Sequence, residues 1–124
     1  TRLRGDLAPA LAAEVKLVLK SPGLAPHDAR IAPLLEAATQ RGLRVMGELG
    51  LFTRALVDLA YAPQVLAITG TNGKTTVTAM TTLLVERAGR RVATAGNIGP
   101  TMLDTLSGWL ERPRDEWPEV WVLE

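Results

Sequence analysis

A glycine-rich segment between an apolar stretch and a long helical pattern constrains the fold of this chain more than any other feature. Residues 67–78 read Ala-Ile-Thr-Gly-Thr-Asn-Gly-Lys-Thr-Thr-Val-Thr. Gly70 and Gly73 allow the backbone to turn sharply and to approach a polyphosphate closely, because neither carries a Cβ atom. Successive N–H groups at the start of the following helix can then surround an anion. The pattern predicts a strand, a phosphate-binding loop and a helix, in that order.

The residue types in this loop suit a nucleotide phosphate site. Lys74 can bring positive charge to the β- and γ-phosphates, and the Thr75 hydroxyl can ligate the Mg²⁺ that bridges them. The common pattern has a glycine five positions before its second glycine, where this chain has Ile68. The loop is therefore a shortened variant. The plain alternative is a tight strand-to-helix turn with an exposed lysine.

The composition limits the classes of protein to which the chain can belong. Its 124 residues are 47% hydrophobic, which predicts one folded domain or two partial ones. The net charge of +1 does not favour a nucleic-acid partner. With no cysteine, the chain cannot form disulfides or thiolate zinc sites, and a cytoplasmic location fits. No apolar run approaches the length of a membrane span, so we expect no membrane insertion.

Patterns typical of strands and of helices alternate along the chain. Strands are expected at residues 15–19, 43–46, 65–68, 91–95 and 119–123, and helices at 29–41, 48–60, 74–88 and 101–110. This alternation predicts an α/β protein with parallel sheets. The polar, proline-bearing segment 111–118 is expected to be a surface connection. Residues 61–63 break the second helix, and we place a domain boundary there.

Several details of the helices follow from single residues. Asp28 is expected to cap the first helix and Thr101 the last, and Gly89 to end the third. In that third helix, the apolar residues at helical spacing are expected to face a core: Val77, Met80, Leu84 and Ala88.

The loops with unusual residues all follow strands. Ligands of parallel α/β sheets bind at the carboxyl ends of strands, where loops 21–24, 70–75 and 96–99 and Glu124 all fall. Glu124 is a candidate Mg²⁺ ligand, or else an exposed terminal residue. Asn97, between two glycines, is a candidate ligand-binding amide, or else a turn residue. Residues 21–23 (Ser-Pro-Gly) could direct backbone N–H groups to a phosphate, although the sequence favours a plain turn.

Three segments together resemble the Mur ligase family. They are residues 65–78 (VLAITGTNGKTTVT), 96–99 (GNIG) and 21–24 (SPGL), with Gly47-Glu48 between them. The final Val122-Leu123-Glu124 is similar to the start of that family's VLELSSFQL segment. The resemblance runs from about Lys16 to the end, whereas the first fifteen residues and the loop 111–118 match nothing specific. Since the chain starts without Met and stops in an apolar strand, we expect it to be a fragment.

The resemblance implies a domain organisation. Residues 1–63 would be the later part of a Rossmann-like N-terminal domain that binds a UDP-sugar. Residues 64–124 would be the first half of a P-loop-type central ATPase domain with a parallel sheet. The C-terminal amino-acid domain of the family would be absent.

The resemblance also implies an activity and a set of site residues. The family member closest in its motifs adds D-glutamate to UDP-N-acetylmuramoyl-L-alanine in peptidoglycan precursor synthesis, using ATP and an acyl-phosphate intermediate. Lys74 would be catalytic, and the ATP phosphates would contact Gly70, Thr71, Asn72, Gly73, Lys74, Thr75 and Thr76. Mg²⁺ would be held at Thr75 and Glu124. The UDP-sugar substrate would contact Ser21, Pro22, Gly23 and Asn97.

Other readings stay open at this point. The family's carbamylated lysine and substrate-binding histidine have no counterpart among these residues, so the chain alone is expected to be inactive. The parent could add a different amino acid, as other Mur-type or folylpolyglutamate-type ligases do. A nucleotide-binding module without chemistry and a plain α/β domain are the remaining alternatives.

Overall fold

The computed structural model of the chain describes residues 8–21, 23–25, 27–97 and 99–124. They form two compact units, one ending at Leu51 and the other running from Phe52 to Glu124. Each unit contains a parallel sheet, which confirms the predicted α/β class with parallel sheets. Of the predicted site residues, Pro22 lies outside the described residues.

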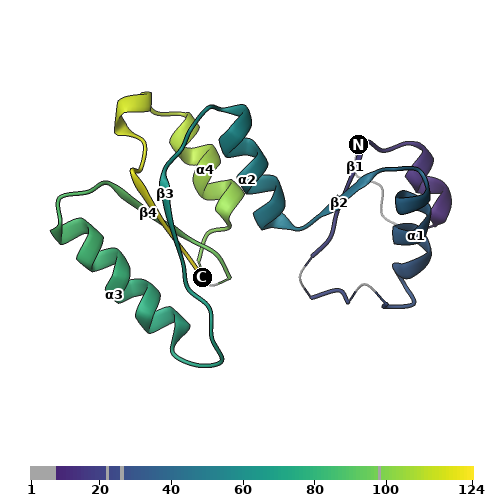
Figure 1. Cartoon of the computed structure of the whole chain (residues 1–124), viewed down its shortest axis with the longest axis horizontal. Helices are drawn as coiled ribbons and strands as arrows, with labels where there is room; N and C mark the ends of the chain where they lie inside the picture. Colours follow the sequence, from purple (N-terminus) through teal and green to yellow (C-terminus); the bar gives the residue numbers. More distant parts are fainter. Residues whose placement is uncertain (1–7, 22, 26, 98) are drawn as a thin grey trace. The chain divides into compact units, whose positions relative to one another are not determined.

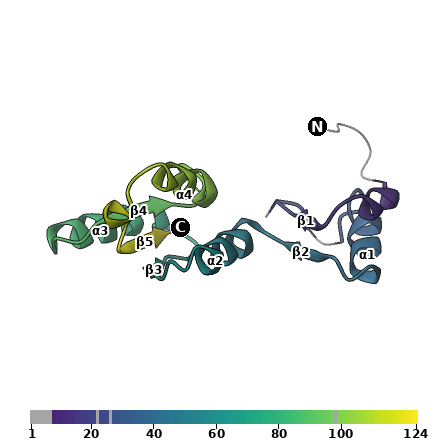
Figure 2. The same cartoon turned by 90° about the horizontal axis from the view of Figure 1, so that it is seen from above.

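The first unit contains two paired strands and a helix. Its elements are η1 (Pro9–Ala13), β1 (Leu17–Leu19), α1 (Ala32–Gln40) and β2 (Arg44–Met46). The two strands pair in parallel, and Figure 2 shows them side by side. Buried Leu34 and Ala38 lie four residues apart on α1, so one face of this helix packs into the core of the unit, where Ala12 of η1 is also buried.

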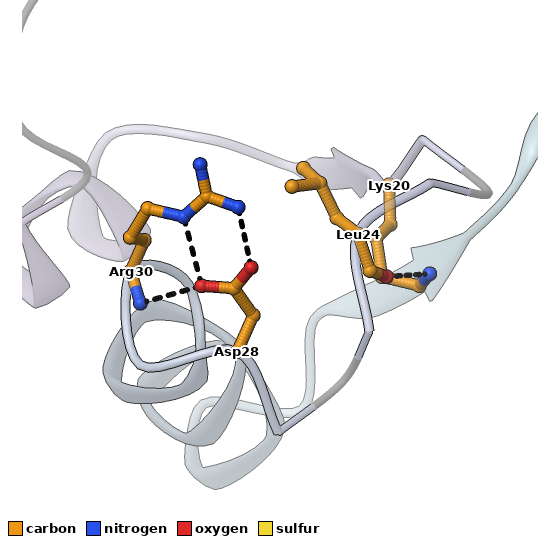
Figure 3. A network of polar contacts seen from close by, with 4 residues as sticks. All are labelled: Lys20, Leu24, Asp28 and Arg30. Carbon is orange, nitrogen blue, oxygen red and sulfur yellow. Dashed lines mark hydrogen bonds and ion pairs between the residues drawn. The ribbon is translucent and has the colours of Figure 1, made fainter.

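The start of α1 differs from the prediction. The N-cap position is Ile31, and no side chain caps it. The carboxylate of Asp28 instead accepts hydrogen bonds from the backbone N–H and the guanidinium of Arg30, as Figure 3 shows. Asp28 therefore does not cap the helix, because α1 begins at Ala32 and its N-cap lies three residues beyond Asp28.

The second unit is built on a three-stranded parallel sheet in the order β3-β5-β4. Its strands are β3 (Gln64–Ala67), β4 (Val92–Ala95) and β5 (Val120–Leu123), and its helices are α2 (Glu48–Asp58), which starts just before the unit, α3 (Lys74–Arg87) and α4 (Met102–Leu110). Figure 2 shows β5 between the other two strands. All four residues of β5 are buried, in agreement with its continuous apolar sequence.

The two faces of this sheet are covered differently. Figure 1 shows α3 on one side of the strands and α2 and α4 on the other. On the α2–α4 side, Trp121 of β5 packs against Phe52 of α2, with ring centroids 4.8 Å apart, and Leu106 of α4 joins the same core. On the α3 side, the hydroxyls of Thr82 and Thr94 lie 2.7 Å apart.

The inward face of α3 is not the predicted one. Val77, Met80 and Leu84 are exposed, by 49%, 60% and 65%, whereas Thr78 is buried. The helix contacts β4 and β5 through Thr78 and Thr82, which lie four residues apart on one face and have small side chains. The apolar positions that recur at helical spacing belong to another part of its surface.

Several local predictions are confirmed. The Thr101 hydroxyl accepts the N–H of Asp104 at 3.1 Å and caps α4. Gly89 follows the end of α3 with a φ of +76°, in the left-handed region. The expectation for residues 111–118 is wrong in part: they include η2 (Arg114–Glu116) and the buried Trp117 and Pro118.

The division between the compact units falls inside α2 and not at Pro63. Phe52 and Leu56 belong to the same core as Trp121, so the last two-thirds of α2 packs with the second unit. The domain boundary placed between residues 63 and 64 stays a prediction, because a division into compact units need not coincide with the domain boundaries of a protein family.

Candidate functional site

The loop between β3 and α3 has the backbone shape that its glycines suggested. Gly70 has a φ of +152° and Gly73, the N-cap of α3, has a φ of +75°. A Cβ atom built on Gly73 would have no neighbour within 4 Å, so this glycine is needed for its left-handed backbone and not for space. The first backbone hydrogen bond of the helix runs from the Val77 N–H to the Gly73 carbonyl, so the N–H groups of residues 74–76 precede the i to i−4 bonding pattern of the helix.

Lys74 closes this loop from its helix side. Its Nζ atom donates to the carbonyl of Gly70 at 2.8 Å, so the side chain folds back over the turn. The ammonium group is thereby held beside the glycine-rich backbone. A carbonyl is a weak partner for an ammonium, so an anion in the loop can compete for it.

Thr75 and Glu124 meet at the carboxyl edge of the sheet. The Thr75 hydroxyl donates to a carboxylate oxygen of Glu124 at 3.4 Å, a long hydrogen bond. Parallel pairing sets Ala67 of β3 level with Leu123 of β5, and this register brings the two strand ends together. A hydroxyl and a carboxylate side by side are the oxygen ligands that Mg²⁺ prefers.

The loop after β4 lies against Glu124 as well. The N–H of Asn97 donates to the backbone carbonyl of Glu124 at 3.3 Å, and Glu124 N–H donates to Ala95 at 3.1 Å. Gly96, with a φ of +142°, comes so close that a Cβ atom there would lie 2.4 Å from the Glu124 carbonyl oxygen. Only glycine allows this approach.

The first unit holds the other predicted substrate residues. Leu24 N–H donates to the Ser21 carbonyl at 3.1 Å, which closes a turn that includes Gly23. The Lys20 Nζ atom donates to the carbonyls of Leu24, at 2.6 Å, and of Ser21, at 3.2 Å, and Figure 3 shows its bond to Leu24. Ser21 and Gly23 are exposed.

The second unit therefore assembles most of the predicted residues at one edge. The loop 70–75, Asn97 and Glu124 all lie at the carboxyl ends of β3, β4 and β5. Sequence reasoning missed two residues that shape the candidate substrate loops, one in each unit. Lys20 has only its place next to a Pro-Gly turn as a signal, and Gly96 was read as a loop residue and not as a close contact of Glu124.

Two kinds of feature are absent from the part of the chain that the structure describes. No group of three or more His, Cys, Asp or Glu side chains gathers there in a way that could hold a metal ion. No helix among them combines the length and apolar character that crossing a bilayer requires.

Taken together, the fold and this edge define an α/β protein with a glycine-rich loop between a parallel strand and a helix. Residues 68–124 match the Mur ligase middle domain. Three curated relatives carry the name UDP-N-acetylmuramoylalanine--D-glutamate ligase. The identity is 57% over 123 residues with the one from Albidiferax ferrireducens, 53% over 123 residues with that from Paraburkholderia xenovorans and 55% over 124 residues with that from Cupriavidus pinatubonensis.

These alignments cover 96–97% of this chain but 24% of each relative, so the chain spans about a quarter of the relatives' length. The chain belongs to the Mur ligase family, as its motifs predicted.

Proposed function

We propose that this chain forms the phosphate-binding part of an ATP-dependent ligase that joins D-glutamate to UDP-N-acetylmuramoyl-L-alanine in peptidoglycan precursor synthesis. The proposal includes a cytoplasmic location for that enzyme. The observation that carries it is the arrangement of Lys74, Thr75 and Glu124 around one glycine-rich loop. The names of the relatives, at 52–57% identity, support the choice of substrates. The N-terminal Rossmann-like and central P-loop-type domains belong to the same proposal.

The loop would bind the triphosphate of ATP. Gly70 and Gly73 shape the backbone, and the N–H groups of Lys74, Thr75 and Thr76 face outward from the start of α3, where the helix dipole favours negative charge. Thr71 and Asn72 lie within the same exposed turn. On binding, the Lys74 ammonium would exchange its bond to Gly70 for phosphate oxygens, where it would neutralise charge that develops during phosphoryl transfer.

Thr75 and Glu124 would hold Mg²⁺. Their adjacent oxygens fit a hard divalent cation, and the rest of its shell would come from ATP and water, because Mg²⁺ keeps several waters in such sites. When bound, the ion would offset the repulsion between the phosphates and the carboxylate. Glu124 would be fixed for this role by its backbone bonds to Ala95 and Asn97.

The substrate carboxylate would receive the γ-phosphoryl group, and the amine of D-glutamate would then displace phosphate to form the amide. Asn97, next to Glu124, would orient the UDP-sugar substrate near this edge. Ser21, Pro22 and Gly23 would bind the same substrate through the turn that Lys20 braces. Whether the two loops share one cleft stays a prediction.

The test is Lys74→Ala in the full-length ligase. Removing one group that stabilises transition-state charge costs roughly 100-fold or more in turnover, so ADP release that depends on both substrates should fall by at least that factor. The matched control is Lys16→Ala, which removes an exposed lysine of the first unit and should leave turnover within about twofold. Near-normal turnover in a folded Lys74→Ala enzyme would rule out the proposed role of the loop.

A further inference from the structure

A second concave site lies at the opposite edge of the three-stranded sheet. It has a volume of about 330 Å³, and its lining comes from the segments that precede β3, β4 and β5. The lining residues are Tyr61, Ala62, Pro63, Gln64, Arg90, Arg91, Arg114, Trp117, Pro118 and Glu119. Because the strands are parallel and four residues long, this edge lies roughly 13 Å from the phosphate loop. The pocket is therefore separate from the candidate ATP site.

The lining carries an excess of positive charge. The lining contains three arginines and one carboxylate, which belong to Arg90, Arg91, Arg114 and Glu119. That carboxylate is shared: Arg90 Nε lies 3.2 Å from one of its oxygens and an Arg91 terminal nitrogen 3.7 Å from the other. One negative charge between two guanidiniums leaves the pocket cationic, so an anion would be attracted to it.

The arginine side chains are already held in position. Arg91 Nε donates to the Trp117 carbonyl at 3.0 Å. Arg114 donates through one terminal nitrogen to the carbonyls of Leu59 and Ala60, just beyond the end of α2. A guanidinium has five N–H donors, and these bonds engage only some of its nitrogens, so each group can donate to a ligand without losing its anchor. Such preorganisation reduces the entropy cost of binding.

The remaining lining is largely apolar and aromatic. The rings of Tyr61 and Trp117 meet edge to face with centroids 5.1 Å apart, and the Arg114 guanidinium lies 5.2 Å from the centroid of the Trp117 ring. Pro63 and Pro118 add rigid walls. The site thus pairs cationic donors with apolar surface, which suits a small organic molecule better than a bare ion.

We propose that this arginine pocket binds a phosphorylated small molecule, with its phosphate against Arg90, Arg91 and Arg114 and its organic part against Tyr61 and Trp117. A phosphate group offers three acceptor oxygens and up to two negative charges, which matches several planar guanidinium forks. A monocarboxylate offers two oxygens and one charge, and so leaves the excess charge of the pocket uncompensated. This site would be occupied independently of ATP.

The first experiment measures pyrophosphate binding to the 124-residue chain with Lys74→Ala, which weakens the competing phosphate loop. Calorimetry gives the affinity, and NMR of arginine Nε–H groups reports the place of binding. We expect binding at physiological ionic strength together with shifts of the Arg90 and Arg91 signals. If Lys74→Ala abolishes pyrophosphate binding, or if malonate binds more tightly than pyrophosphate, the proposal is wrong.

The second experiment changes the pocket itself in the same background. Arg90→Gln removes a guanidinium that forms an ion pair with Glu119, and it should weaken pyrophosphate binding by roughly threefold or more. The double change Arg90→Gln with Arg91→Gln should weaken it by at least about tenfold. Arg87→Gln removes an equal charge from the exposed end of α3 and should change it by less than about twofold.

The comparison between variants separates a site from a general charge effect. Equal losses in Arg87→Gln and Arg90→Gln would show that pyrophosphate responds only to net charge, and would overturn the proposal. Arg90→Lys keeps the charge but loses the planar fork, so it should fall between the parent and Arg90→Gln. Because Arg90→Lys does not remove a charge from the fold, its result stands even if the double variant unfolds.

Discussion

The Thr75 hydroxyl lies 3.4 Å from a carboxylate oxygen of Glu124, although 49 residues separate them in the chain. Parallel pairing of β3 with β5 produces this contact, since it sets the residues that follow both strands at one edge. Glu124 is only partly exposed, and its backbone is hydrogen-bonded to Ala95 and Asn97. The contact places the two oxygens that we propose as Mg²⁺ ligands next to the loop that we propose binds phosphate.

Glu124→Gln should impair the response of the full-length ligase to Mg²⁺. The substitution keeps the shape of the side chain but removes the negative charge that we propose binds Mg²⁺. The Mg²⁺ concentration at half-maximal turnover should rise by roughly 10- to 100-fold. Glu111→Gln, at an exposed position after α4, is the matched control and should leave it unchanged. A Mg²⁺ response that is identical in the two variants would contradict a metal role for Glu124.

Asn97→Ala and Ser21→Ala should each raise the KM of the full-length ligase for its UDP-linked substrate. Both residues are exposed on loops that follow parallel strands, where ligands of such sheets bind. Loss of one hydrogen bond to a substrate is worth about tenfold in KM. Steady-state kinetics with Ser107→Ala, which removes an exposed hydroxyl from α4, gives the baseline. If KM stays at the baseline in both variants, the substrate assignment fails.

Gly96→Ala should destabilise the fold through the contact with Glu124. The new Cβ atom would lie 2.4 Å from a backbone oxygen and 2.8 Å from a backbone nitrogen, and neither can move without disturbing β5. We expect a loss of about 1–3 kcal/mol in the free energy of unfolding, measured by urea denaturation. Gly108→Ala is the contrasting control, because a Cβ atom there meets nothing within 4 Å and α4 should gain about 0.5–1 kcal/mol. Equal stability of the two variants would disprove the close approach.

Asp28 should titrate at unusually low pH. Hydrogen bonds from the Arg30 side chain and backbone lower the pKa of this carboxyl from 3.8 to about 2. Since the folded pKa lies below the unfolded one, the pair stabilises the fold above pH 3.8, and this contribution disappears as the pH falls through about 2. Carbon-detected NMR of Asp28 should show the low midpoint in the parent and in Arg41→Gln. In Arg30→Gln the midpoint should return toward 3.8, and an unchanged midpoint would mean that Arg30 is not the cause.

Tyr61→Phe should weaken the second unit by leaving two buried groups without partners. The Tyr61 hydroxyl accepts the indole N–H of fully buried Trp121 at 2.9 Å and donates to the Pro118 carbonyl. Burial also raises the pKa of this phenol, so the donor stays protonated. We expect a loss of about 1–3 kcal/mol in denaturant unfolding. Thr105→Val removes a surface hydroxyl that bonds to Thr101 and should cost less than about 0.5 kcal/mol. A loss in Tyr61→Phe no larger than in this control would show that the buried hydroxyl bridge contributes little.

The sequence alone was enough to predict the features that depend on neighbours in the chain. Glycine adopts a left-handed backbone without strain and is common at strand-to-helix turns and after helix ends, so Gly73 and Gly89 could be assigned without coordinates. Thr101 caps its helix through a residue three positions away. The apolar run at residues 120–123 predicted a buried strand, and all four side chains are buried. Each of these signals lies within a few residues of what it specifies.

The tertiary structure decided which surfaces meet. Helical periodicity could show that α3 has an apolar row, but it could not show that Thr78 and Thr82 would face the sheet while Met80 and Leu84 remained exposed. The rotation of a helix against a sheet depends on the strand side chains beneath it and on the loop that leads into it. The contacts between Gly96, Asn97 and Glu124 likewise depend on strand order and register. Pairing between distant segments is set by the packing of the whole sheet, and no local pattern of residues contains it.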